Sequence, residues 1–476
     1  MILKWNLHQW ARLLAIPIVV FMAWQVGIYA GRRGITYIEV LSGLFAILGI
    51  IILGRGREGL RIGYVAWIAM LALGYRTADL GNILKLHPLV ILIGVLFVIL
   101  LIYKSGDQRA SIRMFIPRWL LIFTLFWMWG FLVALLRGLN LQLALYNVFS
   151  FTSFIPLLIL TYHLLTTMRD WRVAITSFYI VGTFIALLGM IEFFFPSLRT
   201  ILPGFVGVGT YGNIDQFGFT RASFSFYGNP VASFICAVSL PFVLVLRSWY
   251  RTPTARLLIM LSVLVLLLGI YIGGYRSLWL MVAGAFVVIY ALKRDLSKVG
   301  LIVALIVTVY VITPQSGQER LISIFSAAEG NFVDSSAFKR YERAEISLSL
   351  ILSNPFGVGL SGSGWVHSDI LQITAETGIL GGMVFAGGFL SALLRLGRLY
   401  WAKKDPLDMA LLVSMLIVMN ILIFQTVTVL PQLVAPLWLV WSWVEVRLER
   451  ERLAAPVAQP AAIMPPLDVQ RSRLQV

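Results

Sequence analysis

The sequence has few charged residues, only one cysteine, and none of several common catalytic motifs. Charged side chains make up 12% of its 476 residues, about half of the roughly 25% found in soluble domains. Because Cys236 has no second cysteine to pair with, a disulfide framework and a cysteine-based metal site are both excluded. There is no H-E-x-x-H metal motif, no P-loop and no G-x-S-x-G nucleophile elbow. These absences count against metalloproteases, P-loop nucleotide hydrolases and α/β-hydrolases.

Apolar residues dominate instead, at 59% of the chain. They form runs of about 20 residues from end to end, and each run is long enough to cross a bilayer core as a helix. A membrane β-barrel would show short alternating segments. The pattern therefore predicts an all-α polytopic membrane protein with about 12–14 transmembrane helices. The predicted spans are 11–30, 35–54, 62–76, 88–103, 116–136, 143–165, 172–195, 229–247, 256–273, 277–292, 299–313, 371–394, 407–427 and 430–446.

The formal net charge of +17 is explained by membrane topology and does not indicate binding to nucleic acid. Lys and Arg concentrate in alternate short loops, which the positive-inside rule assigns to the cytoplasm. Both termini are then cytoplasmic, and two long polar segments lie on the outer face. The expected parts are N-terminal transmembrane helices (1–195), an outer-face loop (196–228), transmembrane helices (229–313), a large outer-face loop (314–370), C-terminal transmembrane helices (371–446) and a basic, disordered cytoplasmic tail (447–476).

Two arginines are predicted on the outer face close to the membrane. Arg221 precedes Gly228-Asn229-Pro230, where Asn229 is a candidate helix N-cap and Pro230 suits the first turn. Arg276 lies in the short turn that Gly273-Gly274 predict between two apolar runs. Either arginine would serve as a plain interfacial anchor, but an arginine beside a helix N-terminus also forms a good anion site.

The stretch from Asn354 to Gly382 begins as a glycine-rich polar segment and ends as an apolar helix. His367 lies at the junction, and imidazole is the natural proton acceptor near neutral pH. Asp369 would orient the imidazole, hold a hydroxyl-bearing ligand, or simply complement the helix dipole from the first turn. Gln372 and Glu376 are four residues apart and share one helix face. The other histidines fall on both sides of the membrane, so a multi-histidine metal site is not expected.

Residues 338–352 read as a helix whose first half is charged and whose second half is apolar. Arg340 belongs to the charged half, as do Lys339 and Arg343. Such a face is normally solvated, but it would also complement phosphates.

Taken in order, these motifs resemble the O-antigen ligase/O-antigen polymerase superfamily. They are R-x-S-x-x-x-x-G-N-P from Arg221, G-Y-R-S from Gly274, N-P-F-G-V-G from Asn354, and H-S-D-I-L-Q-x-x-A-E-x-G-I-L-G from His367. The resemblance covers about residues 220–385 in detail. Ser368 follows the histidine where the family commonly has asparagine.

The resemblance implies a GT-C type glycosyltransferase of lipopolysaccharide biosynthesis in the bacterial inner membrane, active on the periplasmic face. It implies a metal-independent, inverting reaction without a cofactor, from an undecaprenyl-diphosphate-linked glycan to a sugar hydroxyl on lipid A-core or a similar acceptor. Arg221 and Arg276 would hold the donor diphosphate, and His367 would be the general base. Arg340, Asp369, Gln372, Glu376 and Asn229 are the expected substrate-binding residues. Membrane lipids are expected partners, and nucleic acid is not.

Three alternatives stay open. A polymerase would join lipid-linked repeat units with the same motifs. A polysaccharide or lipid-glycan transporter would place charged residues at the middle of several spans and would show paired broken helices. Few such residues are present, and no internal repeat is visible. A glycan polymerase of the shape, elongation and division type matches the motifs less well.

Overall fold

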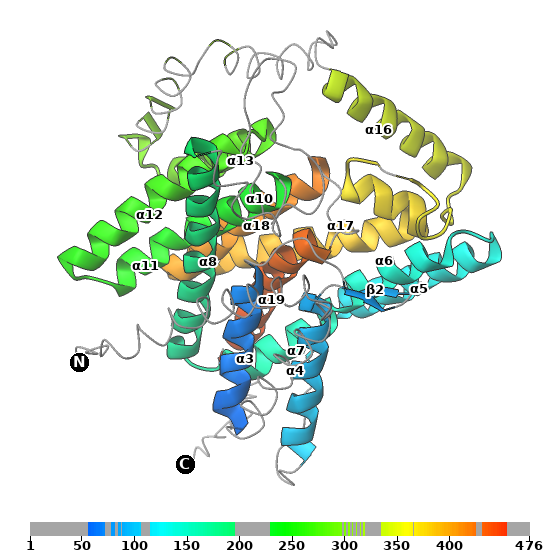
Figure 1. The fold of residues 1–476 in the computed structure, drawn as a ribbon, viewed down its shortest axis with the longest axis horizontal. Coiled ribbons are helices and arrows are strands. Elements are labelled where there is room, and N and C mark those ends of the chain that lie inside the picture. The colour runs from blue at the N-terminus through cyan, green and yellow to red at the C-terminus, as the bar shows by residue number, and fades with distance from the viewer. Residues whose placement is uncertain are drawn as a thin grey trace, which may run out of the picture.

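The computed structural model describes residues 56–71, 78–80, 84–86, 88–105, 115–195, 229–297, 299–300, isolated positions between 303 and 318, and residues 335–364, 366–424 and 431–454. These residues are almost entirely helical (Figure 1). The predicted spans 11–30 and 35–54, the loop 196–228, most of the run 299–313 and the segment from 455 onward lie outside the described residues.

The helices follow the apolar runs of the sequence. They are α3 (Gly56–Met70), α4 (Pro88–Ser105), α5 (Arg118–Leu136), α6 (Leu141–Thr152), α7 (Phe154–Leu164), α8 (Met168–Phe194), α10 (Asn229–Ser239), α11 (Val243–Trp249), α12 (Pro253–Ile272), α13 (Arg276–Leu292), α16 (Ser335–Ser353), α17 (Asp369–Lys403), α18 (Pro406–Phe424) and α19 (Pro431–Ala454). A 3₁₀ turn, η2 (Leu240–Phe242), joins α10 to α11. The strands β1 (Ala78–Leu80) and β2 (Leu84–Leu86) form a small antiparallel hairpin.

Seven helical stretches in the described part of the chain are long and apolar enough to cross a membrane. Helices α6 and α7 form one of these stretches together, and residues Ala232–Trp249 form another. Shorter apolar helices cover Leu92–Leu101 and Leu278–Val288. The prediction of an all-α polytopic membrane protein is confirmed, apart from the small hairpin.

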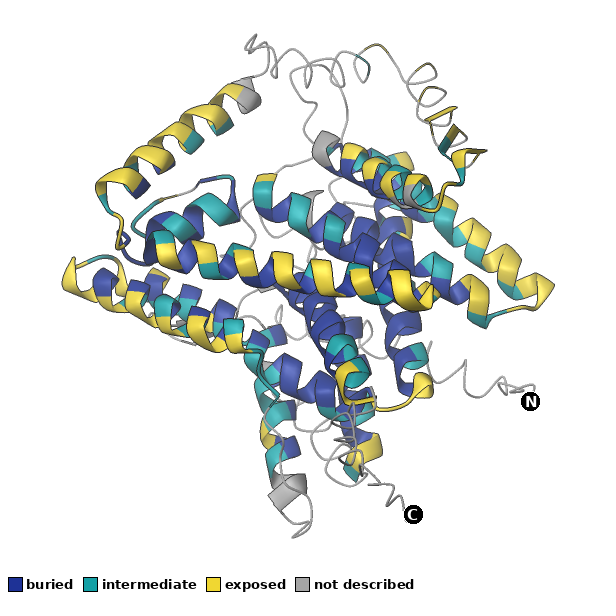
Figure 2. Cartoon of the chain, turned by 180° about the vertical axis from the view of Figure 1, so that it is seen from behind, coloured by how far each residue is buried: buried dark blue, intermediate teal, exposed yellow. Residues whose placement is uncertain are grey.

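Aromatic side chains fill the centre of the bundle where α5, α7, α17 and α19 meet. The indole of Trp441 on α19 stacks on Trp119 of α5, with ring centroids 4.5 Å apart. Trp438 stacks on Phe154 of α7 at 4.3 Å. Both tryptophans are almost completely buried, so this part of α19 lies in the interior of the bundle, which is dark blue in Figure 2.

The outer helices expose large apolar side chains, as expected for surfaces that face lipid. Only 28% of the apolar window of α5 and 22% of that of α12 are buried within the protein. Their exposed faces carry Leu125 and Met260, each 71% exposed. In water such surfaces would be an aggregation hazard, whereas a bilayer covers them.

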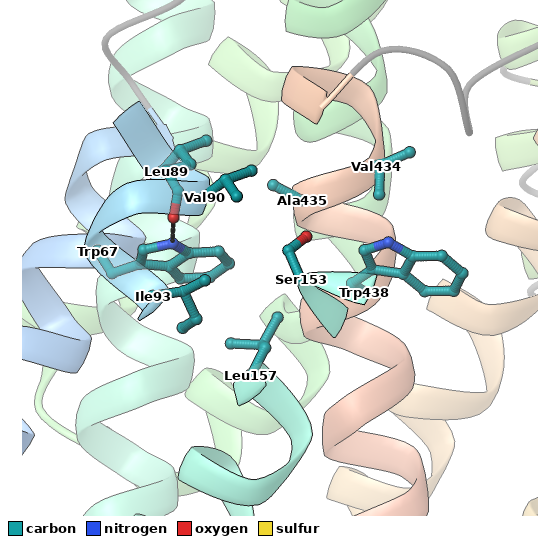
Figure 3. Close-up of a pocket in the computed structure, with 9 residues that line it drawn as sticks. All are labelled: Trp67, Leu89, Val90, Ile93, Ser153, Leu157, Val434, Ala435 and Trp438. Carbon is teal, nitrogen blue, oxygen red and sulfur yellow. Dashed lines mark hydrogen bonds between the residues drawn. The ribbon is translucent and has the colours of Figure 1, made fainter. Parts of the chain in front are cut away.

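A small crevice opens between α3, α4, α7 and α19 (Figure 3). Its lining is mostly apolar, and Trp67 donates a hydrogen bond from Nε1 to the carbonyl oxygen of Leu89 at 2.9 Å. The polar residues singled out in the sequence are not among those that line it.

Helix α19 extends beyond the predicted span end at residue 446 and continues to Ala454. The extension is helical because Arg447 binds acidic residues near the start of α18. Its Nε donates to Asp408 Oδ1 at 2.7 Å, and its Nη2 donates to Asp405 Oδ2 at 2.8 Å. The first residues of the predicted disordered tail are therefore helical.

Candidate functional site

Helix α17 is broken near its start, at Gly378. This residue has φ 85° and ψ 169°, a conformation open to glycine and costly for other residues. A Cβ at this position would lie 2.7 Å from the carbonyl oxygen of Pro355. The predicted span 371–394 is thus two helical segments, a short one from Asp369 to Thr377 and a long one from Ile379 to Lys403.

The glycine-rich loop, residues 354–364, fills the break. The backbone N–H groups of Val358 and Gly359 donate to the carbonyl oxygens of Ala375 and Glu376, at 2.8 and 3.1 Å. In return, the N–H of Ile379 donates to the carbonyl oxygen of Pro355 at 3.0 Å. A helix break leaves backbone N–H and C=O groups without partners, and the loop backbone supplies hydrogen-bond partners for them.

The same loop rests against the α5–α6 hairpin. Leu360 donates its N–H to the carbonyl oxygen of Gly130 at 3.0 Å, and Trp129 donates from Nε1 to the carbonyl oxygen of Phe356 at 2.9 Å. Gly359 has φ 93°, and a Cβ there would lie 2.6 Å from the backbone nitrogen of Ala134. The loop therefore approaches α5 at backbone-to-backbone distance, which explains the glycine.

Side chains also hold the loop at each end. Arg137, just after α5, donates from Nη2 to Oδ1 of Asn354 at 2.9 Å. Asn147 of α6 donates from Nδ2 to Oγ of Ser361 at 3.1 Å. Sequence reasoning missed Arg137 and Asn147, because nothing in their local pattern signals a contact more than 200 residues away.

A buried carboxyl group lies beneath the loop. Glu376 is completely buried, and its Oε1 accepts hydrogen bonds from Ser363 Oγ at 2.9 Å and from Gln372 Nε2 at 3.2 Å. The backbone N–H of Ser361 also donates to this carboxyl group. The predicted pairing of Gln372 and Glu376 on one face is confirmed. Their shared face points toward the loop.

Two buried amide oxygens in this region have no hydrogen-bond partner among the described residues. They are Oε1 of Gln372 and Oδ1 of Asn147. An unsatisfied buried acceptor costs roughly 1–3 kcal/mol, so native proteins retain few of them. These two oxygens beneath the loop can therefore accept hydrogen bonds from hydroxyl groups.

His367 lies at the entrance to this region, directly before α17. It is half-buried and has φ 34°, which is unusual for a residue with a Cβ. Ser368 caps the helix, because its Oγ accepts the N–H of Leu371 at 3.4 Å. Asp369 is buried in the first helical turn. The predicted junction is confirmed at these positions.

The pKa of His367 is lowered from its ordinary value of 6.5. Burial is the largest cause, and the positive charges of Arg340 and Arg343 contribute further. Both arginines lie on α16, which packs against α17. The predicted charged helix is confirmed by α16, and its basic half adds to the effect of burial in lowering the pKa of His367. A neutral imidazole can accept a proton.

The structure describes the other three predicted site residues only in part or not at all. Arg276 begins α13 after the predicted turn at Gly273-Gly274, which is confirmed, but its side chain lies outside the described part of the structure. Asn229 begins α10, and its side chain is likewise not described. Arg221 lies outside the described residues.

The starts of α10 and α13 are nevertheless close together. Ser233, in the first turns of α10, packs directly against Gly273, which ends α12 just before α13. Helices α13 and α17 both pack against α18, and their C-terminal ends meet, with Lys293 Nζ 6.0 Å from the ring centroid of Tyr400. The two helices therefore run in the same direction along α18, and Arg276 and His367 lie at their opposite, N-terminal ends.

No three residues of the His, Cys, Asp and Glu types come together in a metal-binding group within the described ranges. Polar and cationic groups make up the site instead.

Residues 261–386 match the family model described as O-antigen ligase. This match supports the resemblance of the segment to the O-antigen ligase/O-antigen polymerase superfamily. The segment contains the glycine-rich loop, the break in α17, and six of the predicted site residues. These six are Arg276, Arg340, His367, Asp369, Gln372 and Glu376. Asn229 and Arg221 precede the match. No curated protein matches the chain.

The apolar helices indicate a multi-pass membrane protein, and its residues 261–386 are similar to O-antigen ligase. The glycine-rich loop, His367 and α16 all belong to or border the matched segment, which makes this region the candidate active site.

Proposed function

We propose that the protein is a membrane glycosyltransferase of the O-antigen ligase type. It transfers a glycan from an undecaprenyl-diphosphate donor to a sugar hydroxyl of lipid A-core or a similar acceptor, on the periplasmic face of the bacterial inner membrane. The proposal rests on the position and surroundings of His367. It is half-buried, has a lowered pKa, and lies beside the glycine-rich loop within the segment that matches O-antigen ligase.

In the proposed reaction, His367 removes the proton from the acceptor hydroxyl while its oxygen attacks the anomeric carbon of the donor sugar. The new glycosidic C–O bond forms as the bond from that carbon to the diphosphate oxygen breaks. Attack opposite the leaving group inverts the anomeric configuration. The proton stays on the imidazole, and the electron pair leaves with undecaprenyl diphosphate.

The leaving diphosphate carries negative charge, which Arg221 and Arg276 would stabilise in place of a metal ion. The adjacent starts of α10 and α13 support this role, because the N–H groups of two helix N-termini would add to the positive field. Asn229, at the first of these starts, would contact the same phosphates. Arg340 would contribute from α16, where its charge already acts on His367.

The acceptor sugar is assigned to the polar region beneath the glycine-rich loop. Asp369, Gln372 and Glu376 are all buried there, so they contact a sugar only if the loop opens. Gln372 has an amide oxygen available for a hydroxyl group. Glu376 already accepts hydrogen bonds from the loop, which favours a positioning role for this residue.

An in vitro transfer assay tests the proposal. The full-length protein is incubated with lipid-linked glycan donor and lipid A-core acceptor, and the wild type is compared with His367→Ala, Arg221→Ala and Arg276→Ala. We expect each variant to lose at least about a hundredfold in kcat/KM, as is typical for removal of a general base or of a charge-stabilising donor. Arg398→Ala is the control, because Arg398 is an exposed arginine near the other end of α17. Wild-type activity in His367→Ala would refute the base assignment.

The same assay separates ligase from polymerase, the second candidate function within this superfamily. A ligase transfers glycan to lipid A-core, whereas a polymerase elongates glycan only when a second lipid-linked repeat unit is the acceptor. In cells, a null strain would accumulate polymerised but unattached glycan in the first case. It would display surface glycan with a single repeat in the second.

A further inference from the structure

A basic hollow lies between the C-terminal ends of α13 and α17, at the opposite end of α17 from His367. Lys293 and Arg294 line it from the end of α13, and Lys404 lines it from the end of α17. Asp295 is the one carboxylate in its lining, so the hollow carries net positive charge. Residues more than 100 positions apart in sequence thus form one cationic surface.

Two lysines of this hollow share one aromatic ring. The Nζ atoms of Lys293 and Lys404 lie 6.0 and 5.2 Å from the ring centroid of Tyr400. Lys404 also lies 3.5 Å from the ring of Trp401. Cation–π contacts stabilise each ammonium group, but two ammonium groups near one ring repel each other. An anion between them would convert the repulsion into attraction.

Neighbouring cations are arranged differently. Lys403 forms an ion pair with Glu451, and Arg395 forms one with Glu445, both on α19. Asp295, the acid within the hollow, accepts a hydrogen bond from Ser297 at 2.9 Å. Acidic side chains of α19 thus lie beside the cations on one side of the α17 end, while Lys293 and Lys404 lie beside aromatic rings in the hollow.

The backbone holds two of these cations in an uncommon conformation. Arg294 has φ 57° and Lys404 has φ 54°, which are values that helix ends normally reserve for glycine. A cation after a helix C-terminus gains from the helix dipole. That gain explains a single lysine at each end, but not the convergence of both ends on Tyr400 and Trp401.

An apolar stripe leads away from the hollow along α17. Trp401, Leu394, Leu390 and Met383 recur at helical spacing on one face, and all four are 46–56% exposed. Tryptophan is enriched where membrane meets water, so Trp401 marks headgroup depth and the stripe below it faces the hydrocarbon region. The stripe offers a path for an acyl chain, which a free phosphate does not need.

We propose that this hollow binds the headgroup phosphate of an anionic phospholipid, in the leaflet opposite the candidate catalytic face. Lys293, Arg294 and Lys404 contact the phosphate oxygens, Tyr400 and Trp401 form the wall, and an acyl chain lies along the stripe of α17. Basic pockets between membrane helices bind anionic lipids in this way. The inference concerns lipid binding alone and does not rest on the transfer reaction.

Native mass spectrometry of the full-length protein in detergent tests the site. Cardiolipin, phosphatidylcholine or inorganic phosphate is added, and bound adducts are counted over a concentration series. We expect cardiolipin to bind the wild type and phosphatidylcholine to bind far more weakly. Lys293→Gln combined with Lys404→Gln should weaken cardiolipin binding about thirtyfold, since each basic residue near an anionic headgroup raises the affinity roughly fivefold.

The matched control combines Arg251→Gln with Arg256→Gln, which removes the same charge from exposed positions around the start of α12. It should bind cardiolipin as the wild type does. An equal loss in the control would show diffuse attraction and overturn the site, as would displacement of the lipid by millimolar inorganic phosphate. The variant with Lys293→Arg and Lys404→Arg keeps both charges and should retain binding, which separates charge loss from misfolding.

Discussion

Ser363 donates a hydrogen bond from its Oγ to Oε1 of Glu376 across 2.9 Å. The first residue belongs to the glycine-rich loop and the second to the short segment of α17, so this bond joins the two sides of the candidate site. His367 lies between them in sequence, directly before the helix. The bond therefore connects the loop that precedes the proposed base to the helix segment that follows it.

Replacing Ser363 or Glu376 with alanine should lower kcat more than it changes the KM for donor, because the loop loses the anchor nearest His367 while the arginines stay in place. A double-mutant cycle should show a coupling of about 1 kcal/mol or more for groups in one hydrogen-bond network. Glu376→Gln still accepts the bond from Ser363 and should retain more activity than Glu376→Ala. Ser248→Ala is a suitable control, since Ser248 is exposed and bonds to a carbonyl group within α11. Additive effects would mean that the bond has no functional role.

The acidic limb of the pH–activity profile should report the lowered pKa of His367. A base acts when unprotonated, so activity is lost as pH falls through its pKa, and we expect that loss below pH 6.5. Arg343→Gln removes one of the positive charges that lower this pKa. Its profile should shift to higher pH, whereas Arg343→Lys should keep the wild-type profile. The measurement is kcat/KM across pH with saturating acceptor. An opposite shift in Arg343→Gln would contradict the electrostatic assignment.

Alanine at Gly359 or Gly378 should destabilise the protein by about 2 kcal/mol or more, because a side chain in the left-handed region is strained and has no room here. Thermal unfolding in detergent gives the comparison. Gly387 lies in the long segment of α17, and a Cβ added there would meet no other atom within 4 Å. Gly387→Ala should therefore stabilise the protein by about 0.5–1 kcal/mol. If all three variants unfold alike, the close backbone approach is not what selects glycine.

Chelation of divalent metal should leave transfer activity within about twofold of the untreated enzyme, because arginines are proposed to hold the leaving diphosphate in place of a metal ion. The assay is run with and without EDTA, and then with Mg²⁺ restored. Activity that disappears with EDTA and returns with Mg²⁺ would contradict this assignment.

Local features of the site could be predicted from the sequence, because they depend on short-range chemistry. The turn at Gly273-Gly274, the helix beginning after Ser368, and the shared face of Gln372 and Glu376 all follow from turn residues, caps and helical spacing. The helical character of α16 followed in the same way.

Tertiary contacts could not be predicted in this way. The loop binds Trp129 and Asn147 through a backbone carbonyl and a serine hydroxyl, and neither partner has a distinctive local pattern. The break at Gly378 was missed because an isolated glycine is tolerated inside an apolar helical run. Only the approach of Pro355 shows that the helix must open there.

The way in which the loop repairs the break in α17 also sets a rule for exchanging segments between related enzymes. Its bonds to Ala375, Glu376 and Ile379 come from the main chain, so they tolerate many side chains but only one spacing. A chimera that keeps the number of residues between Asn354 and Gly378 would preserve these hydrogen bonds. Adding or removing one residue would shift the loop relative to α17 and break them. Under the proposed function, substitution within this stretch should change acceptor preference without breaking these bonds, whereas a change in its length should break them.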